Sequence, residues 1–200
     1  MLKVPVYLDN HATTPCDPRV VETMLPWFTE NFGNASSRQH AFGWTAAEGV
    51  KMARESVAAL IGASADEIIF TSGATESINL AIKGVADRYA MRGKHIITCV
   101  TEHAAVLDTC DRLEKSGYMI TRLGVSGDGL ICLEELKNAI REDTILVAVM
   151  MANNETGVIQ DIHSISTICR EREVLLLSDA TQAAGKIPID VDRLGIDLLA

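Results

Sequence analysis

The stretch Leu175-Leu176-Leu177-Ser178-Asp179-Ala180-Thr181-Gln182 is an apolar run that ends on an acidic residue. Such a run is typical of a buried strand in a parallel sheet. Asp179 is then expected at the carboxyl end of that strand, where open α/β sheets bind their ligands. The stretch therefore predicts an α/β fold and also the edge of the sheet that carries a site.

Three other stretches have the same layout, in which polar or glycine residues follow a strand signal at once. They are residues 68–76 (IIFTSGATE), 96–103 (IITCVTEH) and 147–157 (VAVMMANNETG). The carboxyl ends of parallel strands meet at one edge of a sheet. A glycine turn, an imidazole, an amide and a carboxylate are therefore expected to form one pocket.

The composition is that of an ordinary globular protein of 200 residues, with 48% hydrophobic and 22% charged residues. The formal net charge of −9 argues against a nucleic-acid surface. The sequence shows no signal peptide and no run approaching the roughly 20 apolar residues of a membrane span. We therefore expect a soluble cytoplasmic protein.

The cysteines are odd in number and form no C-x-x-C pair, which fits a reducing cytosol better than a disulfide framework or a zinc site. The histidines show no metal-ligand spacing with them, so no metal is expected. The five cysteines are Cys16, Cys99, Cys110, Cys132 and Cys169.

The first part of the chain has helical signals. Val4 to Leu8 is expected as a short strand or extended arm. Asp17-Pro18 predicts a helix start, with the helix continuing to about Asn31. A second helix is expected over residues 38–61, with Gly62 as its C-cap.

Strand and helix signals alternate through the rest of the chain, which predicts a mostly parallel sheet with helices on both faces. The strand signals lie near 68–71, 95–100, 118–123, 145–151, 174–178 and 196–200, and the helical signals near 75–90, 104–116, 133–141 and 161–171. We expect an arm at residues 1–15 and one large domain at 16–200. Because residues 195–200 read as part of a strand, the domain is expected to be truncated at its C-terminus.

Two of the polar turns suit the two ends of a flat, charged ligand. Free N–H groups at a helix start after Gly73 favour an anion, and Thr75 adds a hydroxyl donor. The turn is neither a Walker A loop nor a G-x-G-x-x-G turn, and taken alone it is better explained as an ordinary turn with Thr75 as N-cap. Asp179 can hold a ligand nitrogen protonated, or cap a helix, and Gln182 can donate to a ligand oxygen or face solvent.

The other two turns offer an imidazole and an amide. His103 can stack on an aromatic ligand or move protons near neutral pH, or simply cap a helix. Asn153-Asn154-Glu155-Thr156-Gly157 can orient a ligand through an amide, or form a tight turn. Together, a phosphate seat, an acid, an amide and a flat imidazole suit pyridoxal phosphate.

With these residues in place, the chain resembles the N-terminal half of a cysteine desulfurase of the NifS type. This family belongs to the class V aminotransferase group of fold-type I pyridoxal-phosphate enzymes. The matching runs occur in the family's order at residues 7–15, 33–37, 71–79, 101–103, 153–157 and 179–182. The resemblance makes 16–200 an incomplete cofactor-binding large domain of a transferase.

The resemblance also implies a role for each site residue. Ala74 and Thr75 bind the cofactor phosphate, and His103 stacks on the ring and shuttles protons as the catalytic residue. Asp179 pairs with the ring nitrogen. Asn154 and Gln182 contact the side of the ring that carries the hydroxyl.

The implied reaction converts L-cysteine to L-alanine and leaves the sulfur as an enzyme persulfide. This sulfur is expected to pass to an iron–sulfur scaffold or another acceptor protein, and the implied assembly is a homodimer. The family's Schiff-base lysine and persulfide cysteine are expected beyond Ala200, and Lys186 does not match the lysine motif. The chain alone is therefore expected to be inactive.

Two alternatives remain at this point. One is another class V enzyme, either a selenocysteine lyase or an aminotransferase. The other is a non-catalytic binding domain whose site has decayed.

Overall fold

The computed structural model describes residues 5–200, and Val4 of the expected arm lies outside these residues. The chain divides into two compact units. One runs up to Ala59 and includes Ser64–Ile68, and the other comprises Leu60–Ala63 and Ile69–Ala200. The expected division into an arm at 1–15 and a large domain at 16–200 stays a prediction. Among residues 5–200, no helix is long and apolar enough to span a membrane.

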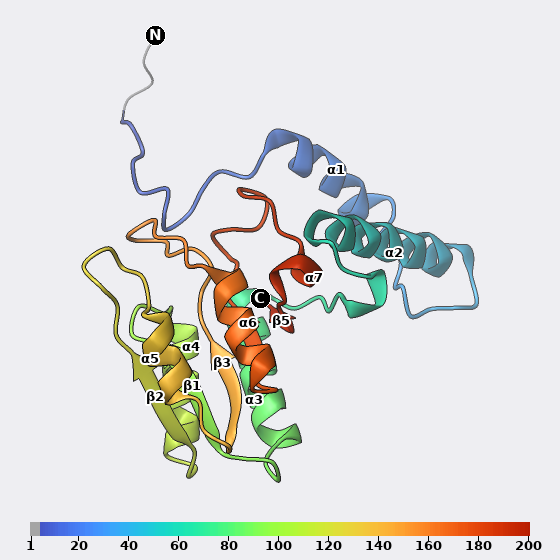
Figure 1. Cartoon of the computed structure of the whole chain (residues 1–200). Helices are drawn as coiled ribbons and strands as arrows, with labels where there is room; N and C mark the ends of the chain where they lie inside the picture. Colours follow the sequence, from blue (N-terminus) through green and yellow to red (C-terminus); the bar gives the residue numbers. More distant parts are fainter. Residues whose placement is uncertain (1–4) are drawn as a thin grey trace. The chain divides into compact units, whose positions relative to one another are not determined.

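Helices form most of the first unit (Figure 1). Helix α1 covers Pro18–Thr29, and Asp17 caps it by accepting the N–H of Arg19 at 2.8 Å. Helix α2 covers Ala41–Ile61, and the short 3₁₀ helix η1 covers Ala65–Glu67. Both predicted helices are confirmed, one ending two residues earlier and one beginning three residues later than expected. Residues 5–8 form no strand.

A close approach holds α1 against α2. A Cβ atom added to Gly49 of α2 would lie 2.1 Å from the ring of Trp27, so any larger residue would push the helices apart. The rings of Phe32 and Phe42 pack 5.8 Å apart in the same unit. The Trp27 ring against the backbone at Gly49 therefore sets how closely the two helices approach each other.

A five-stranded sheet forms the centre of the second unit. Every neighbouring pair is parallel, and the spatial order is β2-β1-β3-β4-β5. The strands are β1 His95–Cys99, β2 Met119–Leu123, β3 Thr144–Ala148, β4 Leu175–Ser178 and β5 Leu198–Leu199. All residues of β1 and β3 are buried, as the apolar runs predicted.

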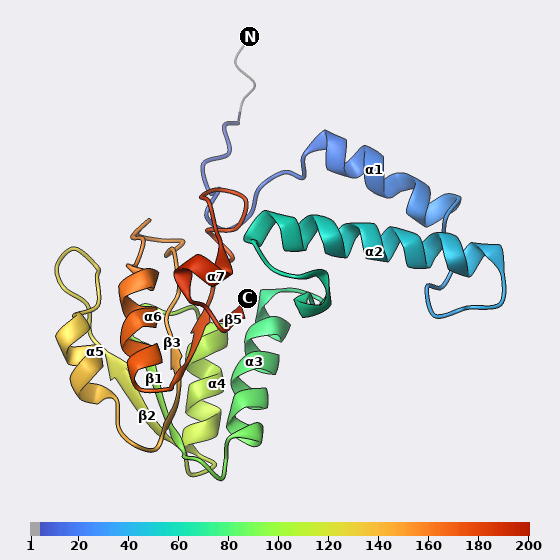
Figure 2. The same ribbon diagram turned by 45° about the vertical axis from the view of Figure 1, so that its right-hand side comes forward.

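Helices cover both faces of this sheet, which confirms the predicted fold class (Figures 1 and 2). They are α3 Ala74–Arg88, α4 Ala104–Glu114, α5 Leu133–Ala139, α6 Ile162–Glu171 and α7 Val191–Leu194. Alternation along β1 sends Ile97 into the core with α5 and α6, and Ile96 into the core with α3 and α4.

One predicted strand is wrong. Residues 68–71 follow η1 and lie outside the five-stranded sheet, although Ile68-Ile69-Phe70 reads as a strand. Ile69 is 70% exposed and Phe70 is 50% exposed. A strand needs a neighbour to complete its backbone hydrogen bonds, and local sequence does not specify that neighbour.

The parallel arrangement brings several loops to one edge. The carboxyl ends of β1, β3 and β4 lie together, and α3 begins at the same edge because it runs back toward the start of β1 (Figure 2). The strand expected over 145–151 ends at Ala148. Beyond it, Val149 still bonds to Leu177 of β4, but the N–H of Met150 bonds to the Glu102 side chain because β1 no longer lies beside it. This edge carries the candidate site.

Candidate functional site

The start of α3 offers free donors for an anion. Gly73 has φ 156° and ψ 177°, a backbone conformation that is essentially limited to glycine. A Cβ atom there would meet nothing within 4 Å, so the space before the helix is open. Within the described residues, no carbonyl accepts the N–H groups of Ala74 and Thr75. The helix start can therefore hold a phosphate group.

Glu76 lies in the same first turn, but its carboxylate faces back along the chain. Its Oε2 accepts the N–H and the hydroxyl of Ser72, both at 2.6 Å. The hydrogen bonds from the side chain and backbone of Ser72 lower the pKa of Glu76. Glu76 thus stabilises the turn and leaves the helix donors free.

His103 caps α4 at the end of the turn after β1. Its Nδ1 accepts the N–H of Ala105 at 3.1 Å, so in this geometry the ring proton lies on Nε2. The ring is exposed. His103 can therefore cap the helix and still present a flat ring and an Nε2 proton to a ligand.

The two asparagines after β3, Asn153 and Asn154, have different environments. Asn153 Oδ1 accepts the N–H groups of Glu155 and Thr156, and Asn153 Nδ2 donates to the carbonyl of Thr101 at 2.9 Å. The side-chain amide of Asn154 is half-buried and makes no hydrogen bond within the described chain. Asn153 therefore builds the turn, and Asn154 is available to a ligand.

Asp179 follows β4 and is 6% exposed. Its Oδ1 accepts the N–H of Thr181 at 2.9 Å, and its carbonyl accepts the N–H of Met151 at 2.8 Å. Its Oδ2 has no protein partner among residues 5–200. A nearly buried carboxylate with one oxygen still available suits a cationic partner.

Gln182 lies in the turn after Asp179, and its Oε1 accepts a hydrogen bond from Lys186 Nζ. Both side chains are at least partly accessible. Lys186 is therefore held by a residue that the sequence predicted as a ligand contact. The Oε1 of Gln182 is engaged, and its NH₂ group stays available.

Glu102, which the sequence reasoning did not select, lies beside this group. It is 7% exposed, and its Oε1 accepts the N–H of Met150 at 2.7 Å. Burial raises the pKa of Glu102 to about 8, the bond from Met150 lowers it, and the charge of Asp179 raises it further. The signal that could have found Glu102 is its place between a strand signal and His103 in the run Thr101-Glu102-His103. Sequence alone, however, does not show that this acid is buried.

Hydrogen bonds join three of the turns. The turn after β1 is tied to the end of β3 through Glu102–Met150 and Thr101–Asn153, and the end of β3 is tied to β4 through Met151–Asp179. His103, Asn154 and Asp179 are therefore carried by one connected assembly. Ala74 and Thr75 reach the same edge from α3, which packs beside α4.

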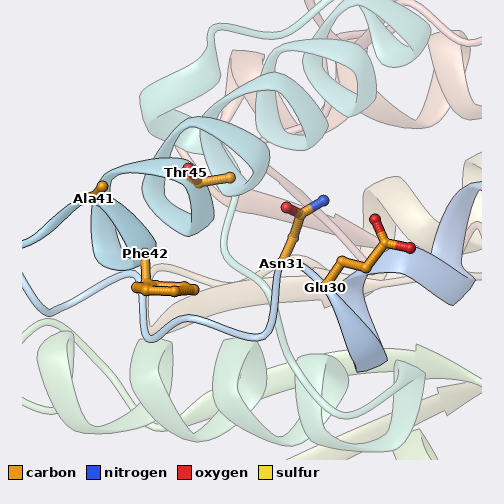
Figure 3. A pocket seen from close by; sticks show the side chains of 5 residues that line it. All are labelled: Glu30, Asn31, Ala41, Phe42 and Thr45. Carbon is orange, nitrogen blue, oxygen red and sulfur yellow. The ribbon is translucent and has the colours of Figure 1, made fainter.

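Other parts of the described chain offer weaker sites. A shallow cavity of about 170 Å³ in the first unit is lined by Glu30, Asn31, Ala41, Phe42 and Thr45 (Figure 3). It contains none of the six predicted site residues.

Burial raises the pKa values of Cys110 and Cys169 to about 12, which disfavours their thiolates. Among residues 5–200, no group of three or more His, Cys, Asp or Glu side chains is arranged to hold a metal.

Comparison with known proteins identifies related sequences. The family model described as aminotransferase class V matches residues 6–200. A protein of Neisseria meningitidis named cysteine desulfurase IscS is 60% identical over 199 residues, which is 100% of this chain and 49% of the relative. The protein of the same name from Pasteurella multocida is 57% identical over 201 residues, covering 100% of this chain and 50% of the relative.

Solved structures share the fold. A structure titled NifS-like protein superposes with a TM-score of 0.94 at 42% identity, covering 97% of this chain and 53% of that one. A structure titled SspA in complex with cysteine has a TM-score of 0.93 at 40% identity, covering 96% and 55%. The chain spans about half the length of the curated relatives it matches.

Proposed function

The chain belongs to the aminotransferase class V family, and from this premise we propose that it forms the cofactor-binding part of a pyridoxal-phosphate-dependent cysteine desulfurase. The reaction proposed for the whole protein converts L-cysteine to L-alanine and transfers the sulfur to an enzyme thiol as a persulfide. The names of the relatives and the residues at the carboxyl edge of the sheet support this proposal.

The residues present fit the cofactor at two separated ends. The free N–H groups of Ala74 and Thr75 and the Thr75 hydroxyl suit the phosphate. The nearly buried Asp179 has an oxygen available for a protonated ring nitrogen. The observation that carries the proposal is that an anion seat and a buried carboxylate lie at one edge of the same sheet.

Once bound, pyridoxal phosphate supplies an electron sink for bond breaking next to an amino group. In the proposal, Asp179 holds the proton on the ring nitrogen. His103 lies with its flat ring exposed, and its Nε2 is the atom that holds or releases a proton, because Nδ1 is engaged by Ala105. Asn154 and the NH₂ group of Gln182 orient the side of the ring that bears the hydroxyl.

The covalent steps require groups that this site does not offer. Lys186 Nζ is bound to Gln182, and the buried Cys110 and Cys169 are poor nucleophiles. We propose that residues other than those of this chain supply the lysine and the persulfide cysteine. We also propose a cytoplasmic homodimer that passes sulfur to an iron–sulfur scaffold or another acceptor protein.

The test assays the whole protein with pyridoxal phosphate and either L-cysteine or L-selenocysteine, and measures alanine. The proposal expects cofactor-dependent alanine and persulfide from L-cysteine, at a rate at least comparable to that with L-selenocysteine. Alanine from L-selenocysteine alone would identify a selenocysteine lyase, and amino-group transfer to a keto acid would identify an aminotransferase. Cofactor binding with no reaction would support a binding domain.

A further inference from the structure

A buried carboxyl group that the proposed function leaves without a role lies between His103 and Asp179. Glu102 is 7% exposed, and its Oε1 accepts the N–H of Met150 at 2.7 Å. Its Oε2 is buried and has no hydrogen-bond partner among the described residues. Buried polar groups are usually paired, so this half-paired carboxyl requires an explanation.

The position of Glu102 follows from where β1 ends. Val149 and Met151 donate their N–H groups toward β4, so the N–H of Met150 between them points toward β1. Strand β1 ends at Cys99, and the next residue, Val100, bonds to Leu123 of β2. Because β1 does not extend beside Met150, the Glu102 carboxyl accepts the Met150 N–H that a longer β1 would otherwise accept.

This bond fixes the turn that carries His103. His103 follows Glu102 directly, and Thr101 before it accepts a hydrogen bond from Asn153 at 2.9 Å. Met151, next to Met150, bonds to the carbonyl of Asp179. Glu102 therefore connects the histidine turn to the end of β3, and β3 connects it to the residue proposed to hold the ring nitrogen.

The charges around Glu102 favour its neutral acid form. Burial raises its pKa to about 8, the N–H of Met150 acts in the opposite direction, and Asp179 at the end of β4 adds to the rise. The charge of Glu102 also acts on the Cys110 thiol on α4, whose own pKa is raised to about 12, chiefly by burial. A neutral carboxyl still accepts the bond of Met150 through its carbonyl oxygen.

Building on the proposed function, we propose that Glu102 is a positioning residue: as a neutral acid it ties the turn of His103 to β3 and leaves the negative charge of the site on Asp179. Glu102 acts through its neighbours and does not contact the substrate. When it ionises, a second buried negative charge appears beside Asp179, and the two carboxylates repel each other and the anionic phosphate of the cofactor.

Two substitutions distinguish the effect of the hydrogen bond to Met150 from the effect of the charge on Glu102. Glu102→Gln keeps a carbonyl acceptor for Met150 and stays neutral at every pH, and Glu102→Leu removes the acceptor. Glu171→Gln at the exposed end of α6 serves as the matched control. The measurements on the whole protein are the pH dependence of unfolding without cofactor, the ring resonances of labelled His103, and the affinity for pyridoxal phosphate.

We expect Glu102→Gln to match wild type at pH 7 in cofactor affinity and in the His103 resonances. Wild type loses stability relative to the Gln variant as the pH rises from 4.5 to about 8, because Glu102 ionises at a lower pH in the unfolded chain than in the folded one. Above pH 8 wild type also loses affinity for the cofactor, whereas the Gln variant does not. Glu102→Leu binds the cofactor at least about fivefold more weakly and shifts the His103 resonances, because the N–H of Met150 is left unpaired. The Glu171→Gln variant follows wild type throughout.

Identical pH profiles for wild type and Glu102→Gln would overturn the proposal, as would a Gln variant that is as impaired as Leu at pH 7. If Glu102→Leu does not fold, the Gln comparison still decides. If wild type binds no pyridoxal phosphate, the proposed function fails, but the unfolding and resonance measurements still test the role of Glu102. The two failures are therefore distinguishable.

Discussion

At the scale of single residues, the candidate site depends on side chains that have one bond to the protein and one atom still available. Asp179 uses Oδ1 for Thr181, and His103 uses Nδ1 for Ala105. Each bond fixes the side chain and leaves Oδ2 or Nε2 for a ligand. Such preorganisation reduces the reorganisation needed when a charge develops.

The first prediction concerns Asp179. In the whole protein, Asp179→Asn keeps the bond to Thr181 but loses the charge that holds the ring nitrogen protonated. We expect alanine formation to fall roughly a hundredfold or more, with the fold and thermal unfolding retained. Asp128→Asn at an exposed position is the control. Near-normal turnover by the Asp179→Asn variant with cofactor bound would reject the role.

The second prediction concerns the phosphate seat. Thr75→Ala removes a hydroxyl donor from the start of α3, and we expect the affinity for pyridoxal phosphate to fall by about fivefold to tenfold. The affinity for pyridoxal, which has no phosphate, changes little. Calorimetric titration of both ligands measures the difference. An equal loss for both would mean that Thr75 does not contact the phosphate.

The strand-end pattern predicted candidate ligand-contact residues at one edge of the sheet, but by itself it did not separate Asn153 from Asn154, and only the family resemblance pointed to Asn154. The two amides are adjacent, and only the turn geometry assigns Asn153 to the Thr101 carbonyl. The sequence reasoning also missed Glu102, because its burial and the end of β1 before Met150 depend on tertiary structure. Local propensity does not contain them.

At the scale of elements, the sheet is held at its opposite edge by a buried histidine. His95 is fully buried at the start of β1, with Nδ1 2.7 Å from Thr144 Oγ1 and Nε2 2.8 Å from Thr121 Oγ1. One side chain thus bridges β1 to β3 on one side and β2 on the other. The bridge lies far along the strands from the candidate site.

The third prediction follows from this bridge. Burial, with the nearby Arg141 charge, lowers the pKa of His95, and Asp143 opposes this. The unfolded chain binds a proton more readily below pH 6.5. Stability contributed by the neutral ring is therefore present above pH 6.5 and is lost as the pH falls below it.

Urea unfolding between about pH 5 and pH 8 measures this loss, with His95→Gln as the comparison. We expect a shallower acid limb for the variant, together with lower stability at neutral pH because one of the two threonine bonds is lost. A variant whose acid limb matches that of wild type would show that another group titrates there.

The sequence predicted the buried strands well and the marginal ones poorly. Strands β1, β3 and β4 are specified by their own apolar runs, because both faces of a parallel sheet are covered. The run at 68–70 is equally apolar, yet it lies outside the sheet. Whether such a run pairs depends on a neighbouring strand, and no local pattern encodes that neighbour.

At the scale of the whole molecule, the proposal assigns the cofactor contacts to this chain and the Schiff-base lysine and persulfide cysteine to other residues, and this division of labour can be tested. The chain is proposed to carry the cofactor contacts, but Lys186 Nζ is hydrogen-bonded to Gln182, and Cys110 and Cys169 are buried with raised pKa values. The fourth prediction is that chain 1–200 alone forms no alanine from L-cysteine and pyridoxal phosphate.

Borohydride treatment of this mixture is expected to fix little cofactor on the chain, measured by mass spectrometry of peptides. The Lys186→Arg variant is the control for any adduct. An adduct on Lys186, or robust alanine formation, would show that the nucleophile lies within these residues and that the division of labour is wrong.

The central claim is that the carboxyl edge of the parallel sheet binds pyridoxal phosphate. A crystal structure of the protein grown with this cofactor tests it most directly. The account predicts the phosphate at the N–H groups of Ala74 and Thr75, the ring against His103, and the ring nitrogen facing Asp179. Cofactor bound in another place, such as the cavity lined by Phe42, or Asp179 turned away from the ring nitrogen, would contradict it.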